Sequence, residues 1–415
     1  MGGEPIRSRP FPAHPVITEK EKRVVLDVLE SGKLSTFIAT PGEYFLGGEK
    51  IKEFEKRFAE YHGVRYAVAF NSATAALHAA VVAVGVTPGS EVIVPPYTFT
   101  STATCALMHN AIPIFADIED ETFGLSAKAV ERAITPLTKA IIVVHLFGHP
   151  ANLKEIAEVA RRHGLPLVED CAQAPGAEYN EHFVGTFGDC GVFSFTESKT
   201  ITCGEGGMLI TNGAEIAELA RMVRNHGEMI ADNQKERSYS SSMVGWNYRM
   251  TEIEAALGIV QLERLDELNQ YRIDLANYLS ERLVGLSGLI TPKIVPGAKH
   301  VYYVYAMKYE EERIGMTRDM FVKAMNAEGI PMSAGYVRPL YLSPLYQQRN
   351  HFAFEHYKGD ARYEKGLCPV AERLYELELI ATGVVRFPAA EADMDDIADA
   401  IRKVMEQAHS CSHAA

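Results

Sequence analysis

Two hydrophobic periods alternate along the first two thirds of the chain. Short apolar runs such as "EVIVP" (91–95) and "LPLVED" (165–170) predict buried strands. The segments between them, such as "LKEIAEVARRHG" (153–164), place apolar residues three and four positions apart and predict helices. Strands this apolar, separated by helices of ten or more residues, are typical of an α/β domain with a mostly parallel sheet covered on both faces.

Capping signals define the first helix. Thr18 and Glu21 have the spacing of a capping box, and Gly32 is a stop signal, so the sequence predicts a helix between them. The same periodicities predict further helices at 51–63 and 72–85, and further strands at 65–70, 112–118 and 139–148.

The pattern changes after residue 247. Residues 247–283 predict one long helix, and a few strands and helices follow, at 301–309, 317–329 and 393–407. We therefore expect a large α/β domain over residues 1–270 and a smaller C-terminal α+β domain over residues 271–415, with the boundary between 265 and 285.

Composition narrows the class of protein. The chain has 415 residues, 47% of them hydrophobic and 23% charged, which is ordinary for a globular protein. A formal charge of -13 argues against nucleic acid or anionic membrane as a partner. The six cysteines form no CxxC pair, and no apolar stretch is long enough to cross a bilayer, so we expect reduced thiols and a cytoplasmic protein. The tail "HSCSH" (409–413) could hold a metal but is expected to be a frayed end, so no metal site is predicted.

Polar residues follow the predicted strands, and ligands of open α/β sheets bind at that edge. "NSATAALHAA" opens a helix with Ser72, Ala73 and Thr74, whose free N–H groups suit a phosphate; an ordinary helix cap is an equally good interpretation. "PYTFTSTA" places Tyr97 and Phe99 after a strand, where an aromatic ring either stacks on a flat heterocycle or belongs to the core.

Two further stretches add ionisable groups. "LVEDCAQAPGA" ends an apolar strand with Glu169 and Asp170, followed by Gln173, and a buried carboxylate needs a positive partner such as a protonated pyridine nitrogen. "FSFTESKTITCGEGGMLIT" holds Ser194 and Lys199 before a glycine-rich turn. A lysine in a desolvated pocket forms Schiff bases with carbonyls, although most lysines are simply exposed. Together the four stretches indicate one ligand, pyridoxal 5'-phosphate.

At these motifs the chain resembles the DegT/StrS-type sugar aminotransferases, pyridoxal phosphate enzymes with the aspartate aminotransferase fold. The resemblance runs from "VLESGKLS" to "DMDDIADAI" and is most specific in "EDCAQAPGAEYNEHFVGTFGDCGVFSFTESKTITCGEGGMLIT". It implies that Lys199 holds the cofactor and later shuttles a proton, and that Asp170 holds the pyridinium nitrogen. The other implied cofactor contacts are Gln173 near the ring oxygen, Phe99 stacked on the ring, and Ser72, Ala73, Thr74 and Ser194 at the phosphate.

The resemblance also implies a homodimer. In "GWNYRMTEIEAALG", Asn247 matches an asparagine that reaches the phosphate of the other subunit, although Asn247 could instead cap the following helix. The implied reaction transfers an amino group from L-glutamate or L-glutamine to a keto-sugar or keto-cyclitol in a ping-pong cycle. Relatives that deoxygenate sugars have histidine in place of the lysine, so Lys199 favours transamination.

The acceptor depends on a loop, "EGIPMSAGYVRPLYLSPLY" (328–346). Gly335 precedes Tyr336, and Tyr341 stands where many relatives have histidine, which resembles the keto-inositol (scyllo-inosose) subgroup more than the nucleotide-sugar enzymes. Tyr336 and Arg338 are candidate substrate contacts, although Arg338 could equally form a surface ion pair. His145 ends a strand and either lines the pocket or is held by hydrogen bonds beneath it. The alternatives are a nucleotide-sugar aminotransferase, a dehydratase on the same cofactor, or a non-catalytic regulatory protein.

Overall fold

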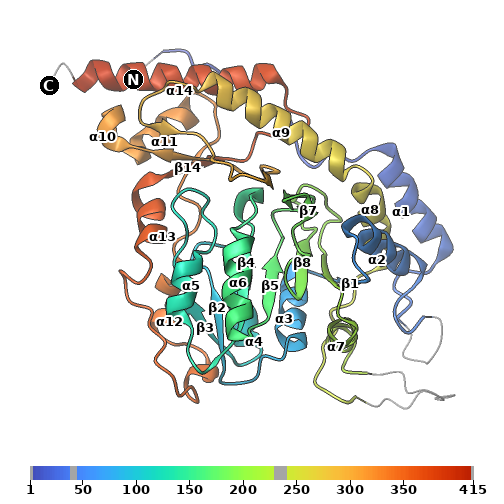
Figure 1. Cartoon of the computed structure of the whole chain (residues 1–415). Helices are drawn as coiled ribbons and strands as arrows, with labels where there is room; N and C mark the ends of the chain where they lie inside the picture. Colours follow the sequence, from blue (N-terminus) through green and yellow to red (C-terminus); the bar gives the residue numbers. More distant parts are fainter. Residues whose placement is uncertain (1–2, 38–43, 229–240, 413–415) are drawn as a thin grey trace.

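A seven-stranded sheet forms the centre of the larger part of the molecule (Figure 1). The computed structural model describes residues 3–37, 44–228 and 241–412, with side chains up to residue 408. The strand order is β1-β9-β8-β5-β4-β2-β3, and only β9 runs antiparallel to its neighbours. The predicted mostly parallel sheet is confirmed. Its strands are β1 (Tyr66–Phe70), β2 (Glu91–Val94), β3 (Ile112–Phe115), β4 (Thr138–Val144), β5 (Leu167–Asp170), β8 (Cys190–Ser194) and β9 (Gly207–Thr211).

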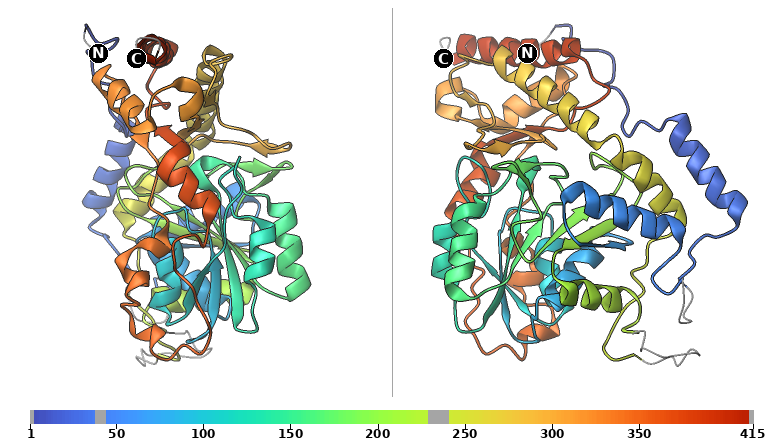
Figure 2. Two further views of the ribbon diagram at one scale, coloured as in Figure 1. Left: turned by 90° about the vertical axis from the view of Figure 1, so that its left-hand side faces the viewer. Right: turned by 45° about the vertical axis from the view of Figure 1, so that its right-hand side comes forward.

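Helices cover both faces of this sheet, and Figure 2 shows strands between two helix layers. The apolar strands predict this arrangement because each face buries its own hydrophobic cluster. One face packs against α3 (Ala73–Ala83), α4 (Ser101–Met108) and α7 (Ala214–Arg224). The other packs against α2 (Glu49–His62), α5 (Ala127–Ala133), α6 (Leu153–His163) and α8 (Glu252–Leu262).

A four-stranded antiparallel sheet forms the second part, which we call the C-terminal unit (Figure 1). It has its own hydrophobic core, and the α+β class predicted for this region is confirmed. The strands, in the order β10-β12-β14-β13, are β10 (Leu289–Ile290), β12 (Tyr305–Tyr309), β14 (Leu379–Thr382) and β13 (Ser333–Ala334). The packed helices are α9 (Leu265–Arg282), α11 (Arg318–Ala327) and α14 (Glu391–Ser412).

The chain crosses between these two parts more than once. Arg7, near the N-terminus, forms ion pairs with Asp393 at 2.7 Å and Asp396 at 2.6 Å, and both aspartates belong to α14. Residues 340–374 return to the large sheet, where Tyr346 and Tyr363 pack around Phe115 of the edge strand β3. The division into residues 1–270 and 271–415 stays a prediction.

The single long helix predicted at 247–283 is wrong. The structure has two helices, because a capping box of Thr251 and Glu254 starts α8 at residue 252 and the chain turns at Glu263 and Arg264 before α9. Arg264 is held at this turn by an ion pair with Glu21 at 3.1 Å, and Glu263 is paired with Lys20 and Arg57. The predicted capping box at Thr18 and Glu21 is confirmed, and it starts α1 (Glu19–Ser31).

No helix in the described ranges is both long enough and apolar enough to cross a membrane.

Short elements complete the fold. A three-stranded ribbon consists of β11 (Ala298–Lys299), β6 (Glu178–Tyr179) and β7 (His182–Phe183). The short helices are η1 (Leu146–Gly148), α10 (Glu311–Ile314), η2 (Leu340–Leu342), α12 (Pro344–Gln347), η3 (Phe352–Phe354), α13 (Pro369–Arg373) and η4 (Leu374–Glu378). The side chains of the "HSCSH" tail lie outside the described residues.

Candidate functional site

A cavity of about 320 Å³ lies at the carboxyl ends of the parallel strands. The last residues of three strands line it: Val144 of β4, Asp170 of β5 and Ser194 of β8. This is the edge of an open α/β sheet where ligands bind, and it contains most of the residues singled out from the sequence. Those that line the cavity are Ser72, Ala73, Thr74, Phe99, Asp170, Gln173, Ser194, Lys199 and Tyr336.

Asp170 is a buried carboxyl group at the wall of this cavity. Its side chain is buried, and it accepts hydrogen bonds from Thr102 Oγ1 at 2.7 Å and from the Ala172 amide at 3.1 Å. No basic side chain of the described residues comes within ion-pair distance of it, and burial raises the pKa of Asp170 above its usual value. A buried carboxylate without a cation is costly, so this site is suited to a positively charged ligand group.

Glu169, the preceding residue, points to the other face of β5. Its carboxylate accepts the amides of Gly185, Phe187 and Gly188 at 2.8, 2.7 and 2.6 Å. The fourth partner is His145 Nε2 at 3.1 Å. Glu169 is therefore fully satisfied within the protein and anchors the loop after β7.

His145 belongs to this buried network and does not line the cavity. Its Nδ1 accepts the Ala151 amide at 3.0 Å, so its proton lies on Nε2 and faces Glu169. The interpretation of a histidine held beneath the site is the one the structure supports. The thiol of Cys171 lies close to His145 and Glu169, and these three side chains could in principle ligate a metal ion. Two observations argue against this. Burial raises the pKa of the Cys171 thiol far above its usual value, and the other two side chains are already hydrogen-bonded to each other.

The turn before α3 has the features of an anion site. Ser72 Oγ accepts the Ala75 amide at 3.1 Å and caps the helix, which leaves the first N–H groups without helical acceptors. Strand β9 runs directly beside this turn at Gly207, where a Cβ atom would lie 2.4 Å from the Ser72 carbonyl carbon. Only glycine permits this approach, which keeps the turn and Ser194 on one side of the same cavity.

Lys199 lies in the loop after β8 and reaches into the cavity. Its backbone is fixed by two hydrogen bonds: its amide donates to Thr196 O at 2.9 Å, and its carbonyl is 3.1 Å from His14 Nε2. The amine lies 4.5 Å from the ring centre of Tyr303, a cation–π distance. The lysine side chain makes no ion pair with any carboxylate in the described residues, so its amine stays available to a ligand.

Gln173 joins this part of the cavity to the C-terminal unit. Its Oε1 accepts the Phe147 amide at 2.8 Å, and its Nε2 donates to Tyr336 OH at 2.9 Å. The Tyr336 amide in turn donates to Tyr97 OH at 2.9 Å. Burial raises the pKa of Tyr336 to about 12, so this phenol is neutral at ordinary pH.

The two aromatic candidates after β2 have separate roles. Tyr97 is almost fully buried, whereas Phe99 lines the cavity with 58% of its surface exposed. An exposed ring at a cavity wall can stack on a ligand.

Three residues singled out from the sequence lie outside this cavity. Asn247 is outside the cavity of its own chain: its backbone bridges to Asn225, and its Oδ1 accepts from Arg249 Nε at 2.9 Å. It does not cap α8, because Thr251 does. Arg338 is exposed and does not line the cavity.

Tyr341 is the third. It is completely buried, where its hydroxyl binds Glu372 and accepts the Cys368 amide at 3.2 Å. Tyr341 is therefore a core residue and offers no group to a ligand.

Several cavity residues were missed from the sequence. Tyr303 lies in a stretch predicted only as a strand, and no role is predicted for Ser101 or Ser198. Thr102, the buried hydroxyl that donates to Asp170, was missed as well. Thr102 could have been found, because it lies in the quoted stretch "PYTFTSTA". Tyr303 carried no such signal, since it comes from a distant part of the chain.

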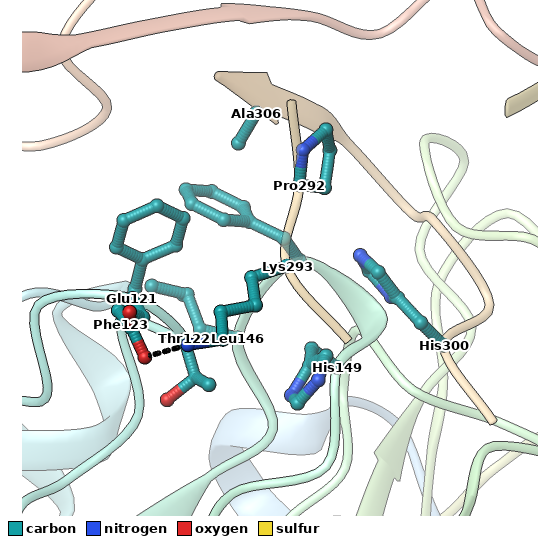
Figure 3. A pocket seen from close by; sticks show the side chains of 10 residues that line it. Glu121, Thr122, Phe123, Leu146, His149, Pro292, Lys293, His300 and Ala306 are labelled. Atoms are coloured by element: carbon teal, nitrogen blue, oxygen red, sulfur yellow. Dashed lines mark hydrogen bonds and ion pairs between the residues drawn. The ribbon is translucent and has the colours of Figure 1, made fainter. Parts of the chain in front are cut away.

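A second, much smaller cavity of about 10 Å³ lies between the two parts of the molecule (Figure 3). The ion pair of Glu121 and Lys293 lies at its edge. Burial lowers the pKa of His149 to about 4 and that of His300 to about 3, so both are neutral. The space suits one water molecule and no larger ligand.

Comparisons with known proteins agree with this geometry. Residues 17–380 match the model of the DegT/DnrJ/EryC1/StrS aminotransferase family. The chain is 39% identical to GDP-perosamine synthase of Caulobacter vibrioides, over 80% of this chain and 86% of that protein. It is 38% identical to L-glutamine:2-deoxy-scyllo-inosose aminotransferase of Streptoalloteichus tenebrarius, over 97% and 96% of the two chains. The structure of DesV from S. venezuelae in complex with a ketimine intermediate superposes with a TM-score of 0.81 at 31% identity, over 94% and 95% of the chains.

The match therefore runs over nearly the whole chain and includes every strand that borders the cavity. The expected fold class and the expectation of an enzyme of the aminotransferase type are confirmed. The protein belongs to the DegT/DnrJ/EryC1/StrS aminotransferase family.

Proposed function

We propose that the protein is a pyridoxal 5'-phosphate-dependent aminotransferase that moves an amino group from L-glutamate or L-glutamine to a keto-sugar or keto-cyclitol. The observation that carries this proposal is that one cavity holds both the amine of Lys199 and a buried carboxylate, Asp170, that forms no ion pair within the described residues. A cationic ring nitrogen at the first and an aldehyde at the second are what this cofactor offers.

The remaining cavity residues fit the same cofactor. The capped start of α3 at Ser72, together with Ser194, offers hydrogen-bond donors to a phosphate. Phe99 offers an exposed ring face, and Gln173 closes the side toward the C-terminal unit. We assign these residues, with Ala73 and Thr74, to cofactor binding.

Pyridoxal phosphate, when bound, supplies an aldehyde that bonds covalently to amines and a ring that accepts an electron pair. Lys199 Nζ would hold the aldehyde group of the cofactor, and the same amine would serve as the base that takes up the α-proton of the amino donor. Asp170 would keep a proton on the ring nitrogen, and Thr102 and Ala172 orient its two carboxylate oxygens for this. Tyr303, beside the lysine amine, excludes water from one side of it.

The acceptor is a polyhydroxylated ketone in this proposal. The cavity presents hydroxyl groups from Thr98, Ser101, Ser198 and Tyr336, which suit such a molecule. Relatives act on two acceptor classes by name, a keto-cyclitol and a GDP-linked sugar, so a nucleotide-linked keto-sugar is the second candidate. Because Tyr341 is buried against Glu372, it makes no contact that separates these classes.

The proposal includes a homodimer in which Asn247 serves the partner's cavity. Asn247 lies outside its own cavity, on a segment fixed by the stacked rings of Trp246 and Tyr248. Such a segment can present a side chain outward to a second subunit. A cytoplasmic location stays a prediction.

The visible absorption spectrum of the purified protein tests the proposal. After addition of pyridoxal phosphate, we expect a yellow band that bleaches with L-glutamate or L-glutamine and returns with a keto-cyclitol or a nucleotide-linked keto-sugar. A protein that takes up no cofactor, or whose band no amino acid changes, would contradict the proposal.

A further inference from the structure

Tyr303 contacts the loop of Lys199 at two points. The Lys199 amine lies over the tyrosine ring, 4.5 Å from its centre, and the tyrosine hydroxyl is 3.2 Å from Ser198 Oγ. The tyrosine is half-buried and lines the cavity. One face of the ring is therefore turned toward the amine, while the hydroxyl is held at the neighbouring residue.

The segment that carries Tyr303 has an unusual backbone. The preceding residue, Tyr302, has a φ of 47°, in the left-handed region that residues other than glycine seldom adopt. Its amide donates to His300 Nδ1 at 3.2 Å, and its ring stacks on that histidine in the core. Gly148 of η1 approaches so closely that a Cβ atom there would lie 2.9 Å from the Tyr303 nitrogen. These contacts keep Tyr302 in the core and direct Tyr303 to the cavity.

Arg272 of α9 holds the same segment from the side of the C-terminal unit. It is 2% exposed, and its Nη1 donates to the carbonyls of Tyr302 and Tyr303, both at 3.3 Å. Within the described part of the chain its guanidinium forms no ion pair. A buried cation without an anionic partner is costly, so its hydrogen bonds to these two carbonyls are the contribution that the structure shows.

Two carboxyl groups line the cavity, and neither pairs with Lys199. Asp170 accepts a hydrogen bond from Thr102 Oγ1 at 2.7 Å, and Glu205 accepts one from Thr196 Oγ1 at 3.2 Å. In the described ranges, neither carboxylate comes within ion-pair distance of the lysine amine. When this amine takes up a proton, its new charge therefore has no anionic side chain beside it among the described residues.

The face of an aromatic ring suits an amine that changes its charge. Such a face carries negative charge density and attracts a cation that lies within about 6 Å of the ring centre. A carboxylate at the same place would hold the ammonium form more strongly, because opposite charges attract strongly where water is excluded. The ring attracts the cation less strongly and accepts no proton, so the amine stays able to release its proton again.

We propose that Tyr303 is a catalytic residue whose ring face stabilises the ammonium form of Lys199 each time this amine takes up a proton, and that Arg272 is the positioning residue that holds the ring there. This assignment rests on the proposed aminotransferase function. It adds the group that balances the charge of the proton carrier.

The first half-reaction separates the ring from the hydroxyl, because bleaching of the cofactor band needs only the amino donor. In Tyr303→Leu we expect the maximal bleaching rate to fall about 10-fold, while the donor concentration for half-maximal rate changes less than about twofold. Tyr303→Phe keeps the ring face and should stay within about twofold of the wild type. Tyr278→Leu, a half-buried tyrosine of α9 that does not line the cavity, is the matched control and should bleach at the wild-type rate.

A double-mutant cycle tests the role of Arg272. Arg272→Met should lower the bleaching rate in the wild-type background, and it should lower it less than about twofold further in Tyr303→Leu, where no ring remains to be positioned. A loss that is the same in both backgrounds would overturn the positioning role. If Arg272→Met does not fold, the Tyr303 variants still test the ring.

Equilibrium binding to cofactor-free protein gives a readout that needs no turnover. In Lys199→Ala the space of the amine is open, and ethylammonium serves as a small cation that can occupy it. Adding Tyr303→Leu should weaken ethylammonium binding at least about fivefold and change ethanol binding less than about twofold, whereas Tyr303→Phe should change neither. Titration followed by nuclear magnetic resonance measures these affinities, and Asp170 is present in every variant compared.

Three results would overturn the assignment: an equal loss of bleaching rate in Tyr303→Phe and Tyr303→Leu, a wild-type rate in a folded Tyr303→Leu protein, or ethylammonium binding that does not depend on the ring. If no amino acid bleaches the wild-type band, the proposed function fails instead. The ethylammonium comparison then still decides whether the ring of Tyr303 holds a cation at this place.

Discussion

Glu169 and Asp170 are neighbours on one strand and have opposite environments. Glu169 accepts three backbone amides and His145, all from the protein. Asp170 accepts one hydroxyl and one amide and faces a cavity with no cation at ion-pair distance in the described residues. Because successive side chains of a strand point to opposite faces, β5 places one carboxylate in a network of protein hydrogen bonds and the next at the cavity.

Burial alone does not distinguish a carboxylate at a ligand-binding cavity from one within the protein's own hydrogen-bond network. Both carboxylates are buried, at 0% and 4% exposed, and both follow the same apolar run. The number of protein partners separates them. Substitutions on the cavity side should therefore affect activity, and substitutions on the other side should affect stability.

Replacing Lys199 by alanine tests the cavity side most strongly. We expect turnover to fall by at least about 1,000-fold, since in the proposed function Lys199 is both the covalent anchor of the cofactor and the proton carrier. Thermal unfolding should change little, because the amine has no ion pair to lose within the described structure. Steady-state kinetics and calorimetry measure the two effects, and turnover near the wild-type rate would contradict the role given to Lys199.

Asp170→Asn should lower turnover by about 100-fold, because a neutral amide cannot hold the proton on the ring nitrogen. In the cofactor-free protein, the same substitution should raise the stability of the fold at neutral pH. Burial raises the folded-state pKa of Asp170, so its contribution to stability is present below the unfolded value of about 3.8 and is lost as the pH rises through the folded-state pKa.

The cofactor-free Asp170→Asn protein should accordingly gain stability relative to the wild type as the pH rises above about 4. Denaturant unfolding from pH 4 to 8 measures this difference. A variant that becomes relatively less stable over this range would show that a protein cation compensates Asp170.

Glu169→Gln should affect stability much more than activity. The amide would present N–H groups to amides that already donate, and the free energy of unfolding should fall by about 2 to 3 kcal/mol. Turnover per folded molecule should stay within a few-fold of the wild type. A large loss of turnover in a stable Glu169→Gln protein would remove the distinction between the two carboxylates.

Thr102→Val should have the smallest effect. The variant removes the hydroxyl that donates to Asp170 and keeps the side-chain volume. We expect turnover to fall about 5- to 10-fold and the cofactor to bind more weakly, since a hydrogen bond to a charged group contributes about 1.5 kcal/mol. Thr104→Val, on the same helix, removes a hydroxyl that donates to the Thr100 carbonyl and does not contact Asp170, so it is the matched control.

Local patterns predicted most of the fold and much of the cavity. The apolar runs identified the parallel strands, and the rule that ligands bind at their carboxyl ends brought Ser72, Asp170 and Ser194 together before any coordinates. The break between α8 and α9 was missed because ion pairs of Arg264 and Glu263 with distant residues, which no local period contains, hold the turn. Tyr303 was missed for the same reason: it meets Lys199 only through packing of the C-terminal unit.

The hydrogen bonds of Gln173 determine where one hydrogen atom of Tyr336 can go. A backbone amide can only donate, so the Phe147 N–H fixes Oε1 of the glutamine and leaves Nε2 to donate to the tyrosine oxygen. The phenolic hydrogen is then unused by Gln173 and can rotate toward an oxygen of a bound molecule. A glutamate at position 173 would accept that hydrogen itself, and Tyr336 would then have no hydrogen left to donate to a ligand.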